Sequence, residues 1–213
     1  GAEIGLSETA TALQKQLSNF AKNRMRPIGQ TLDKMQAKEV IAEDSPFWDF
    51  RKEFTQFGLA VSTLQGFPAD EIPDIMTVIF EELGYGDAGL AISVGVDILP
   101  HYMAMKFGND FVAKTYDESL IGCWAITEPD HGTDSLDPEG RIFHETGDYG
   151  TPGCFVEITD GKIIINGQKS AWVSNGPIAD LAILYCPVKT KDGKIDHRHG
   201  AVVIVPLDVQ FYR

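Results

Sequence analysis

The chain has 213 residues, of which 43% are hydrophobic and 23% are charged, as is usual for a globular protein of one large or two small domains. Its net charge of −13 argues against a nucleic acid or an anionic membrane as a partner, because both bind to basic surfaces. We see no signal peptide or transit segment at the start of the sequence. The three cysteines, Cys123, Cys154 and Cys186, are far apart and lack metal-ligand spacing, so we expect reduced, buried thiols of an intracellular protein.

Apolar stripes at helical spacing predict three helices in the first part of the chain. The first helix follows Ser7, which can cap it, and Pro27 is expected to kink or end it. The second begins at Ser45-Pro46 and carries phenylalanines that we assign to the core, and the third ends at Gly84 or Gly86. The stripes consist of Ala10, Leu13, Leu17 and Phe20; of Phe47, Phe50, Phe54 and Phe57; and of Ile72, Ile75, Ile79 and Leu83.

The segment Ala88–Val96 is almost wholly apolar but too short to cross a membrane. A helix without a polar face must be buried by its neighbours. Its small residues, Ala91, Ser93 and Gly95, would allow close approach by a packed helix or by a ligand chain, and both interpretations stay open. Another short helix is predicted at Asn109–Thr115.

From Ile121 onward the pattern changes to short apolar runs separated by turn residues, including Asp160-Gly161 and Asp192-Gly193. We therefore predict a multi-domain α+β protein. An all-α domain at residues 1–120 precedes a mostly antiparallel, barrel-like or sandwich-like β domain at 121–213 that looks incomplete. The predicted strands are Ile121–Ile126, Cys154–Ile158, Lys162–Ile165, Ala171–Val173, Leu181–Val188 and Ala201–Val205.

Two stretches of the β half carry residues suited to ligand binding. Cys123–Ser135 is a strand that runs into a Gly-containing loop rich in hydroxyls, and such a loop can offer N–H groups and hydroxyls to an anion. Asn166–Gly176 is predicted to be a turn followed by a strand with a central Trp172. On such a strand Ser174 would share the face of the indole, so the ring and the hydroxyl could meet one planar ligand. On residue types alone, ordinary strand and turn residues explain both stretches without any ligand, and this is the simpler interpretation.

The two stretches resemble the signatures of a known family. ITEPDHGTD, at residues 126–134, is similar to the T-E-P-x-x-G-S/T-D signature of the acyl-CoA dehydrogenases, and INGQKSAWVSNG, at 165–176, is similar to their I-N-G-x-K-x-W-I-T/S-N-G signature. Weaker resemblance extends to Phe20–Pro27 and Glu81–Gly89, so it covers nearly the whole chain. His131 departs from the family pattern, which has a small residue there, and we expect an exposed loop histidine. The segment Leu136–Gly153 resembles an insertion, and its turn residues predict a long surface loop that is a candidate for substrate or subunit contacts.

The resemblance implies an FAD site built from both motifs. Thr127 would bind the pyrimidine edge of the flavin, with Trp124 and Ile126 beside the ring system. Thr133, which keeps the hydroxyl of the usual serine, would contact the pyrophosphate of FAD or the bound acyl-CoA substrate. These roles follow from the resemblance and not from the charge or spacing of the residues.

In the second motif, the resemblance implies that Trp172 packs against the isoalloxazine and that Ser174 donates a hydrogen bond toward flavin N5. The implied reaction is α,β-dehydrogenation of an acyl-CoA thioester, with electrons passing to an electron-transferring flavoprotein. The family's catalytic carboxylate belongs to a C-terminal helical region that this sequence lacks, so we nominate no base and expect this chain alone to be inactive. Glu128 is expected to be structural, and no metal ligand set is seen; His197 and His199 are assigned to a solvated turn.

The resemblance also implies a homodimer or homotetramer in the bacterial cytoplasm or, as second choice, the mitochondrial matrix. Two alternatives remain open at this stage. One is a flavin monooxygenase or oxidase of the same fold, and the other is a non-catalytic subunit that binds acyl-CoA or flavin.

Overall fold

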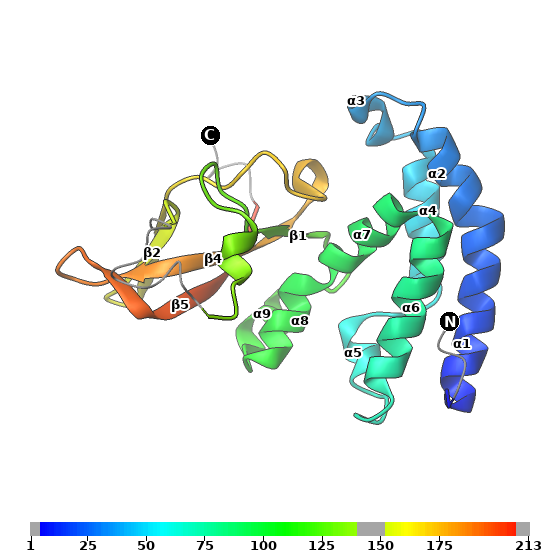
Figure 1. The fold of residues 1–213 in the computed structure, drawn as a ribbon, viewed down its shortest axis with the longest axis horizontal. Coiled ribbons are helices and arrows are strands. Elements are labelled where there is room, and N and C mark those ends of the chain that lie inside the picture. Colours follow the sequence, from blue (N-terminus) through cyan, green and yellow to red (C-terminus); the bar gives the residue numbers. More distant parts are fainter. Residues whose placement is uncertain (1–4, 140–151, 208–213) are drawn as a thin grey trace. The chain divides into compact units, whose positions relative to one another are not determined.

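A computed structural model of the chain describes residues 5–139 and 152–207 (Figure 1). Contacts between Cα atoms divide the chain into two units, Gly1–Ile98 and Leu99–Arg213. The change from helix to strand comes later, after Thr115 and before Gly122. The domain boundary at residues 120 and 121 stays a prediction, because it follows the change of secondary structure and the contacts divide the chain earlier.

The first unit is all-helical in its described residues. Ser7 caps the first helix as expected, since its Oγ accepts a hydrogen bond from the N–H of Ala10 at 3.2 Å. The chain does not leave the helical conformation at Pro27. The first helix passes into a π-helical segment, Ala21–Met25, and the proline then lies in the first turn of Arg26–Leu32, where its missing N–H is tolerated. The helical elements are α1 (Glu8–Phe20), the π-helical segment (Ala21–Met25), α2 (Arg26–Leu32), α3 (Ala37–Val40), α4 (Pro46–Thr55), α5 (Val61–Leu64), α6 (Ile72–Gly86) and α7 (Ala88–Asp97).

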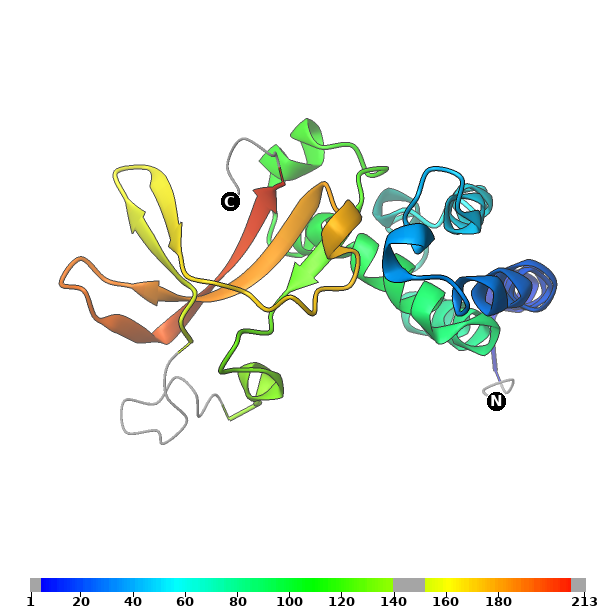
Figure 2. The same cartoon turned by 90° about the horizontal axis from the view of Figure 1, so that it is seen from above.

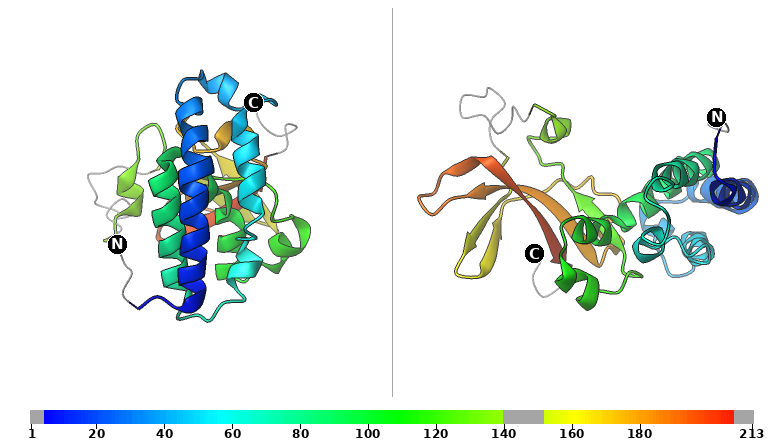
Figure 3. Two further views of the ribbon diagram at one scale, coloured as in Figure 1. Left: turned by 90° about the vertical axis from the view of Figure 1, so that its right-hand side faces the viewer. Right: turned by 90° about the horizontal axis from the view of Figure 1, so that it is seen from below.

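The predicted stripes form the core of this unit, in which α1 packs against α6 (Figure 3). Leu17, Ile75 and Leu83 are fully buried. The phenylalanine run of α4 joins them: Phe50 is fully buried and stacks on Phe20 with ring centroids 6.1 Å apart. The periodic apolar residues therefore predicted both the helices and the faces that they bury.

Helix α7 contacts α6, and the approach is close at one glycine. A Cβ on Gly95 would lie 3.0 Å from the Phe80 ring, which is tighter than ordinary contact. This supports helix packing as a reason for the small residues of α7. No single helix of the described residues is long and apolar enough to cross a membrane; α7 and α8 (Leu99–Lys106) reach that length and composition only as a bent pair.

The second unit is a five-stranded sheet with helices α8 and α9 (Asp110–Thr115), of which α8 contacts β1 and β4. The long strand β4 is central: β5 pairs with one edge, and β1 and β2 pair with the other in succession (Figure 2). The strands are β1 (Gly122–Ala125), β2 (Phe155–Thr159), β3 (Lys162–Asn166), β4 (Leu181–Lys189) and β5 (Ile195–Pro206).

The predicted order of a helical half followed by a β half is confirmed, and so is the hairpin at Asp160-Gly161, where both residues have positive φ. The sheet is mixed, however, because β1 and β2 both run parallel to β4. Two further expectations are wrong. Ala171–Val173 forms no strand, and the backbone at His197 and His199 belongs to β5 instead of a turn. Most of the predicted loop at Leu136–Gly153 lies outside the described residues.

Candidate functional site

The two sequence motifs lie side by side and are joined by hydrogen bonds. The N–H of Ser170 donates to the carbonyl of Thr127 at 2.7 Å, and the Asn175 side-chain amide donates to the carbonyl of Gly122 at 3.1 Å. These two bonds fasten the segment after β3 along β1 and the loop that follows β1. The bonds also explain why 171–173 forms no strand, since this segment is held by isolated contacts and not by a ladder.

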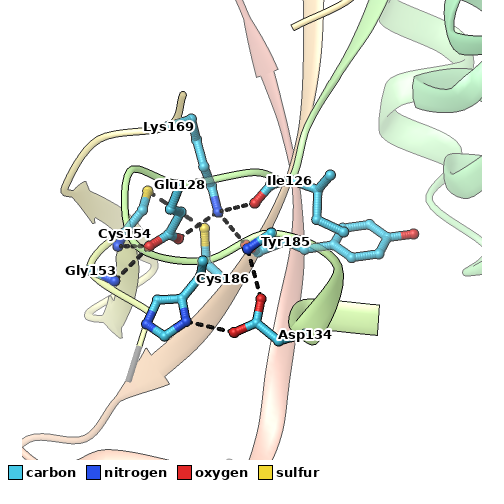
Figure 4. Close-up of polar contacts among 10 residues, drawn as sticks. Ile126, Glu128, Asp134, Gly153, Cys154, Lys169, Tyr185 and Cys186 are labelled. Atoms are coloured by element: carbon cyan, nitrogen blue, oxygen red, sulfur yellow. Dashed lines mark hydrogen bonds and ion pairs between the residues drawn. The ribbon is translucent and has the colours of Figure 1, made fainter. Parts of the chain in front are cut away.

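A buried ion pair joins the same two motifs (Figure 4). Lys169 Nζ lies 2.7 Å from Glu128 Oε1, and the two side chains are only 10% and 3% exposed. The ammonium also donates to the carbonyls of Tyr185, at 2.7 Å, and Ile126, at 3.3 Å. Glu128 Oε2 in turn accepts from the N–H groups of Gly153, at 2.6 Å, and Cys154.

Every oxygen of the Glu128 carboxylate is thus used in holding chain segments together, which supports the structural role expected for this residue. The Glu128 side chain is buried and does not line the cavity described below. This contact has a signal in the sequence. A glutamate in the first motif and a lysine in the second are the opposite charges that a buried pair requires.

Gly167, in the second motif, has a backbone that requires glycine. Its φ is +125°, and a Cβ there would lie 2.4 Å from the Cα of Cys154 and from the carbonyl oxygen of Gly153. The turn after β3 therefore passes directly over the chain that enters β2. Asn175 has a left-handed backbone as well, with φ at 63°, and this turns its amide toward β1.

The candidate residues of β1 and its loop occupy different environments. Trp124 is half-buried and packs edge-on against Tyr185 of β4, with ring centroids 5.7 Å apart. Its indole Nε1 is buried without a hydrogen-bond partner among the described residues. Ile126 and Thr127 are half-buried, and Thr133 is exposed in a short 3₁₀ helix, Thr133–Leu136.

The candidate residues of the second motif face solvent. Trp172 is 87% exposed and Ser174 is exposed. The expectation that these two share a strand face is wrong, because the backbone at 172–174 is irregular. Within the described residues, the hydroxyls of Thr127, Thr133 and Ser174 have no hydrogen-bond partner. The structure thus brings the two motifs together and leaves the Trp172 indole and the hydroxyls of Thr127 and Ser174 available on the segments that meet there.

His131 is not the exposed loop residue that we expected, because it is buried and its Nδ1 lies 2.7 Å from Asp134 Oδ2. The other carboxylate oxygen of Asp134 accepts the N–H of Gly132 at 2.7 Å. Burial opposes the charge on Asp134, but the hydrogen bonds from His131 and Gly132 outweigh it and hold the pKa of this carboxyl below its usual value. These contacts fix the loop that carries Thr133.

A cavity of about 940 Å³ lies on one face of the sheet, below the segment 169–173. Apolar side chains of β1, β3, β4 and β5 line it, together with Lys169 and Cys154. None of the six candidate residues contributes to its lining. The predicted cofactor contacts therefore do not belong to this cavity. Among the described residues, no group of three or more His, Cys, Asp or Glu side chains could hold a metal ion.

Comparison with known proteins supports the resemblance read from the two motifs. The chain is 23% identical over 193 residues to a mitochondrial isovaleryl-CoA dehydrogenase of Arabidopsis thaliana, a match that covers 87% of this chain and 42% of the relative. It superposes on an acyl-CoA dehydrogenase complexed with FAD from Bacillus anthracis with a TM-score of 0.68 and 22% identity, over 98% of this chain and 32% of that one. No family model matches the sequence.

A third likeness widens the functional range of the fold. The flavoprotein nitroalkane oxidase matches with a TM-score of 0.67 and 17% identity, over 96% of this chain and 50% of that one. The class is therefore clear: the chain has the acyl-CoA dehydrogenase fold. Its sequence is related to acyl-CoA dehydrogenases, and it spans about 42% of the length of the first of these relatives.

Proposed function

We propose that this chain carries the flavin-binding region and part of the acyl-CoA-binding region of an FAD-dependent acyl-CoA dehydrogenase. The observation that carries the proposal is the junction of the two motifs. The hydrogen bond from Ser170 to Thr127 sets a solvent-exposed indole beside hydroxyls that have no partner within the described residues. An exposed indole at this junction is a flat apolar surface on which a planar ligand can stack.

The residues at the junction fit the chemistry of FAD. Trp172 supplies a flat apolar surface for the isoalloxazine, and Thr127 and Ser174 supply hydroxyls for its polar edge. Thr133 supplies a hydroxyl for the pyrophosphate or for acyl-CoA. Trp124, on the strand that leads into this loop, has a buried indole N–H that no described residue accepts, and Ile126 follows the same strand.

Bound FAD would supply a hydride acceptor for the β-carbon of the acyl-CoA thioester, and an electron-transferring flavoprotein is the proposed acceptor of the electrons. The chain's own residues would orient the ring and bind its polar edge. The ion pair between Lys169 and Glu128 would hold the two motifs at a fixed spacing. None of the described residues is assigned as the base. A homo-oligomer in the bacterial cytoplasm or mitochondrial matrix is part of the same proposal.

The experiment is anaerobic mixing of the FAD-loaded protein that contains this chain with acyl-CoA thioesters. Dehydrogenation predicts loss of the oxidised flavin absorbance and formation of the enoyl thioester. Oxidase activity is the second candidate, because the nitroalkane oxidase shares the fold; it predicts flavin reduction by another substrate class and consumption of oxygen on reoxidation. Flavin binding without reduction by any acyl-CoA would contradict the dehydrogenase and favour a non-catalytic subunit.

A further inference from the structure

Cys154 and Cys186 form a thiol pair in the core of the sheet. Their Sγ atoms are 3.9 Å apart, although the residues are 32 positions apart in the sequence, and both side chains are buried. The parallel register of β2 and β4 pairs Val156 with Val188, and two residues earlier it sets Cys154 opposite Cys186. A disulfide has an S–S distance of about 2 Å, so the two sulfurs at 3.9 Å would have to approach each other further to form one.

Charged and polar groups around the pair make the two thiols unequal. The two Sγ atoms lie within hydrogen-bonding distance of each other, and either thiol can donate. Donation from Cys186, together with the nearby Lys169 ammonium, lowers the pKa of Cys154 to about 7 against the opposing effects of burial and of Glu128. The same contact and burial raise the pKa of Cys186. Cys154 is therefore the member that becomes a thiolate near neutral pH, and the thiolate is the nucleophilic form.

The third cysteine provides a matched internal control. Cys123 and Cys154 both line the cavity of about 940 Å³, so a small reagent that enters the cavity meets both. Both are equally buried, at 2% exposure. Burial raises the pKa of Cys123 to about 11, and no structural contact pairs it with another thiol of the described chain. A difference in reactivity between Cys123 and Cys154 therefore reflects the pairing of Cys154 with Cys186 and not a difference in reagent access.

We propose that Cys154 and Cys186 are a redox-reactive dithiol that a peroxide converts into an intramolecular disulfide. In the first step the Cys154 thiolate attacks one peroxide oxygen, the O–O bond breaks, and a sulfenic acid forms as hydroxide leaves. In the second step the Cys186 sulfur attacks Cys154 Sγ, the S–O bond breaks, and the thiol proton goes to the departing oxygen. The two thiols lose two electrons and one hydrogen peroxide becomes two waters, so the step is balanced. A dithiol reductant reverses it.

The pair also lies next to the contacts that join the two motifs. The N–H of Cys154 donates to Glu128 at 3.2 Å, and Glu128 is bound to Lys169. The proposed disulfide would therefore form one hydrogen bond away from the ion pair of the candidate flavin site. Its formation does not depend on the function proposed for that site.

The test is differential labelling of the purified, fully reduced chain after treatment with hydrogen peroxide at neutral pH. Free thiols are blocked with one alkylating reagent in urea, the protein is then reduced, and newly released thiols receive a second reagent. We expect the second label on Cys154 and Cys186 in equal amounts, at a level about tenfold or more above that on Cys123. Peptide mapping without reduction should recover Cys154 linked to Cys186.

The proposal is overturned if all three cysteines carry only the first label, or if Cys123 carries the second label as often as the other two. Two variants sharpen the result. C123S should still form the linked peptide. C186S should form none and should instead accumulate a Cys154 sulfenic acid that a cyclic diketone traps. The result on the unmodified chain decides the matter even if a variant fails to fold.

Discussion

Replacing Lys169 by methionine removes the cation of the buried ion pair that joins the two motifs. The substitution leaves the Glu128 carboxylate buried at 3% exposure, and the carbonyls of Ile126 and Tyr185 lose their donor. Removing one partner of a buried ion pair costs about 3–5 kcal/mol, because the other charge stays in a poorly solvated site. That is a large part of the free energy of unfolding of an ordinary domain, which is about 5–15 kcal/mol.

Lys114→Met is the matched control. Lys114 pairs with Asp110 on the surface at 3.2 Å, with side chains 77% and 81% exposed, and loss of such a pair costs about 0.5 kcal/mol or less. Urea denaturation would be followed by tryptophan fluorescence in a Trp48→Phe background, so that the signal comes from the unit containing the sheet. Equal loss of stability in the Lys169 and Lys114 variants would refute the assignment of the buried pair as the main link between the motifs.

Three further results are expected. Gly167→Ala should lower the free energy of unfolding, measured by urea denaturation, by about 2 kcal/mol or more, because the added Cβ has no space. Gly161→Ala is the control: Gly161 also has a positive φ, of +75°, but lies in open space, so the loss should be about 1 kcal/mol. Equal losses in the two variants would contradict the close approach at Gly167. The alkylation rate of Cys154, followed by mass spectrometry of the labelled peptide, should rise with pH and reach half its maximum near pH 7. The reason is that the pKa of Cys154 is about 7 and only the thiolate reacts. A midpoint above pH 9 would contradict the pairing with Cys186. Asp134→Asn should reduce stability at neutral pH and have a vanishing effect in acid. The pKa of Asp134 is lower in the folded state than in the unfolded state, where it is about 3.9. The charge therefore stabilises the fold above the unfolded-state pKa, and this stabilisation is lost as the pH falls through the folded-state pKa. A stability difference that persists unchanged at low pH would show that the Asp134 charge is not involved.

The parts of the fold that local patterns encode were predictable from the sequence. The apolar stripe ending in Phe20 predicts a helix, and Asp160-Gly161 predicts a tight turn, from residues that are close together in the sequence. The structure confirms both elements. Strand order was not predictable, since an alternating pattern gives the buried face of a strand but not its neighbour or direction. For this reason the parallel pairing of β1 with β4 was missed.

The errors at the site have a similar origin. Ala171–Val173 has the residues of a strand, yet its backbone is bound by single contacts such as that from Ser170 to Thr127. The burial of His131 depends on Asp134, which its own loop brings into place. The pair of Glu128 and Lys169 spans 41 positions of sequence, and only the folded chain brings such groups together.

Titration of FAD into the purified chain, followed by flavin fluorescence, tests the central claim most directly. If the exposed indole of Trp172 is the surface on which the flavin ring stacks, Trp172→Ala should weaken FAD binding by about 5- to 150-fold, the equivalent of about 1–3 kcal/mol for a planar ring on an aromatic side chain. Phe111→Ala, at another exposed aromatic of the same unit with 67% exposure, should leave the affinity unchanged. Equal FAD affinity in the Trp172 variant and the unmodified chain would contradict the account.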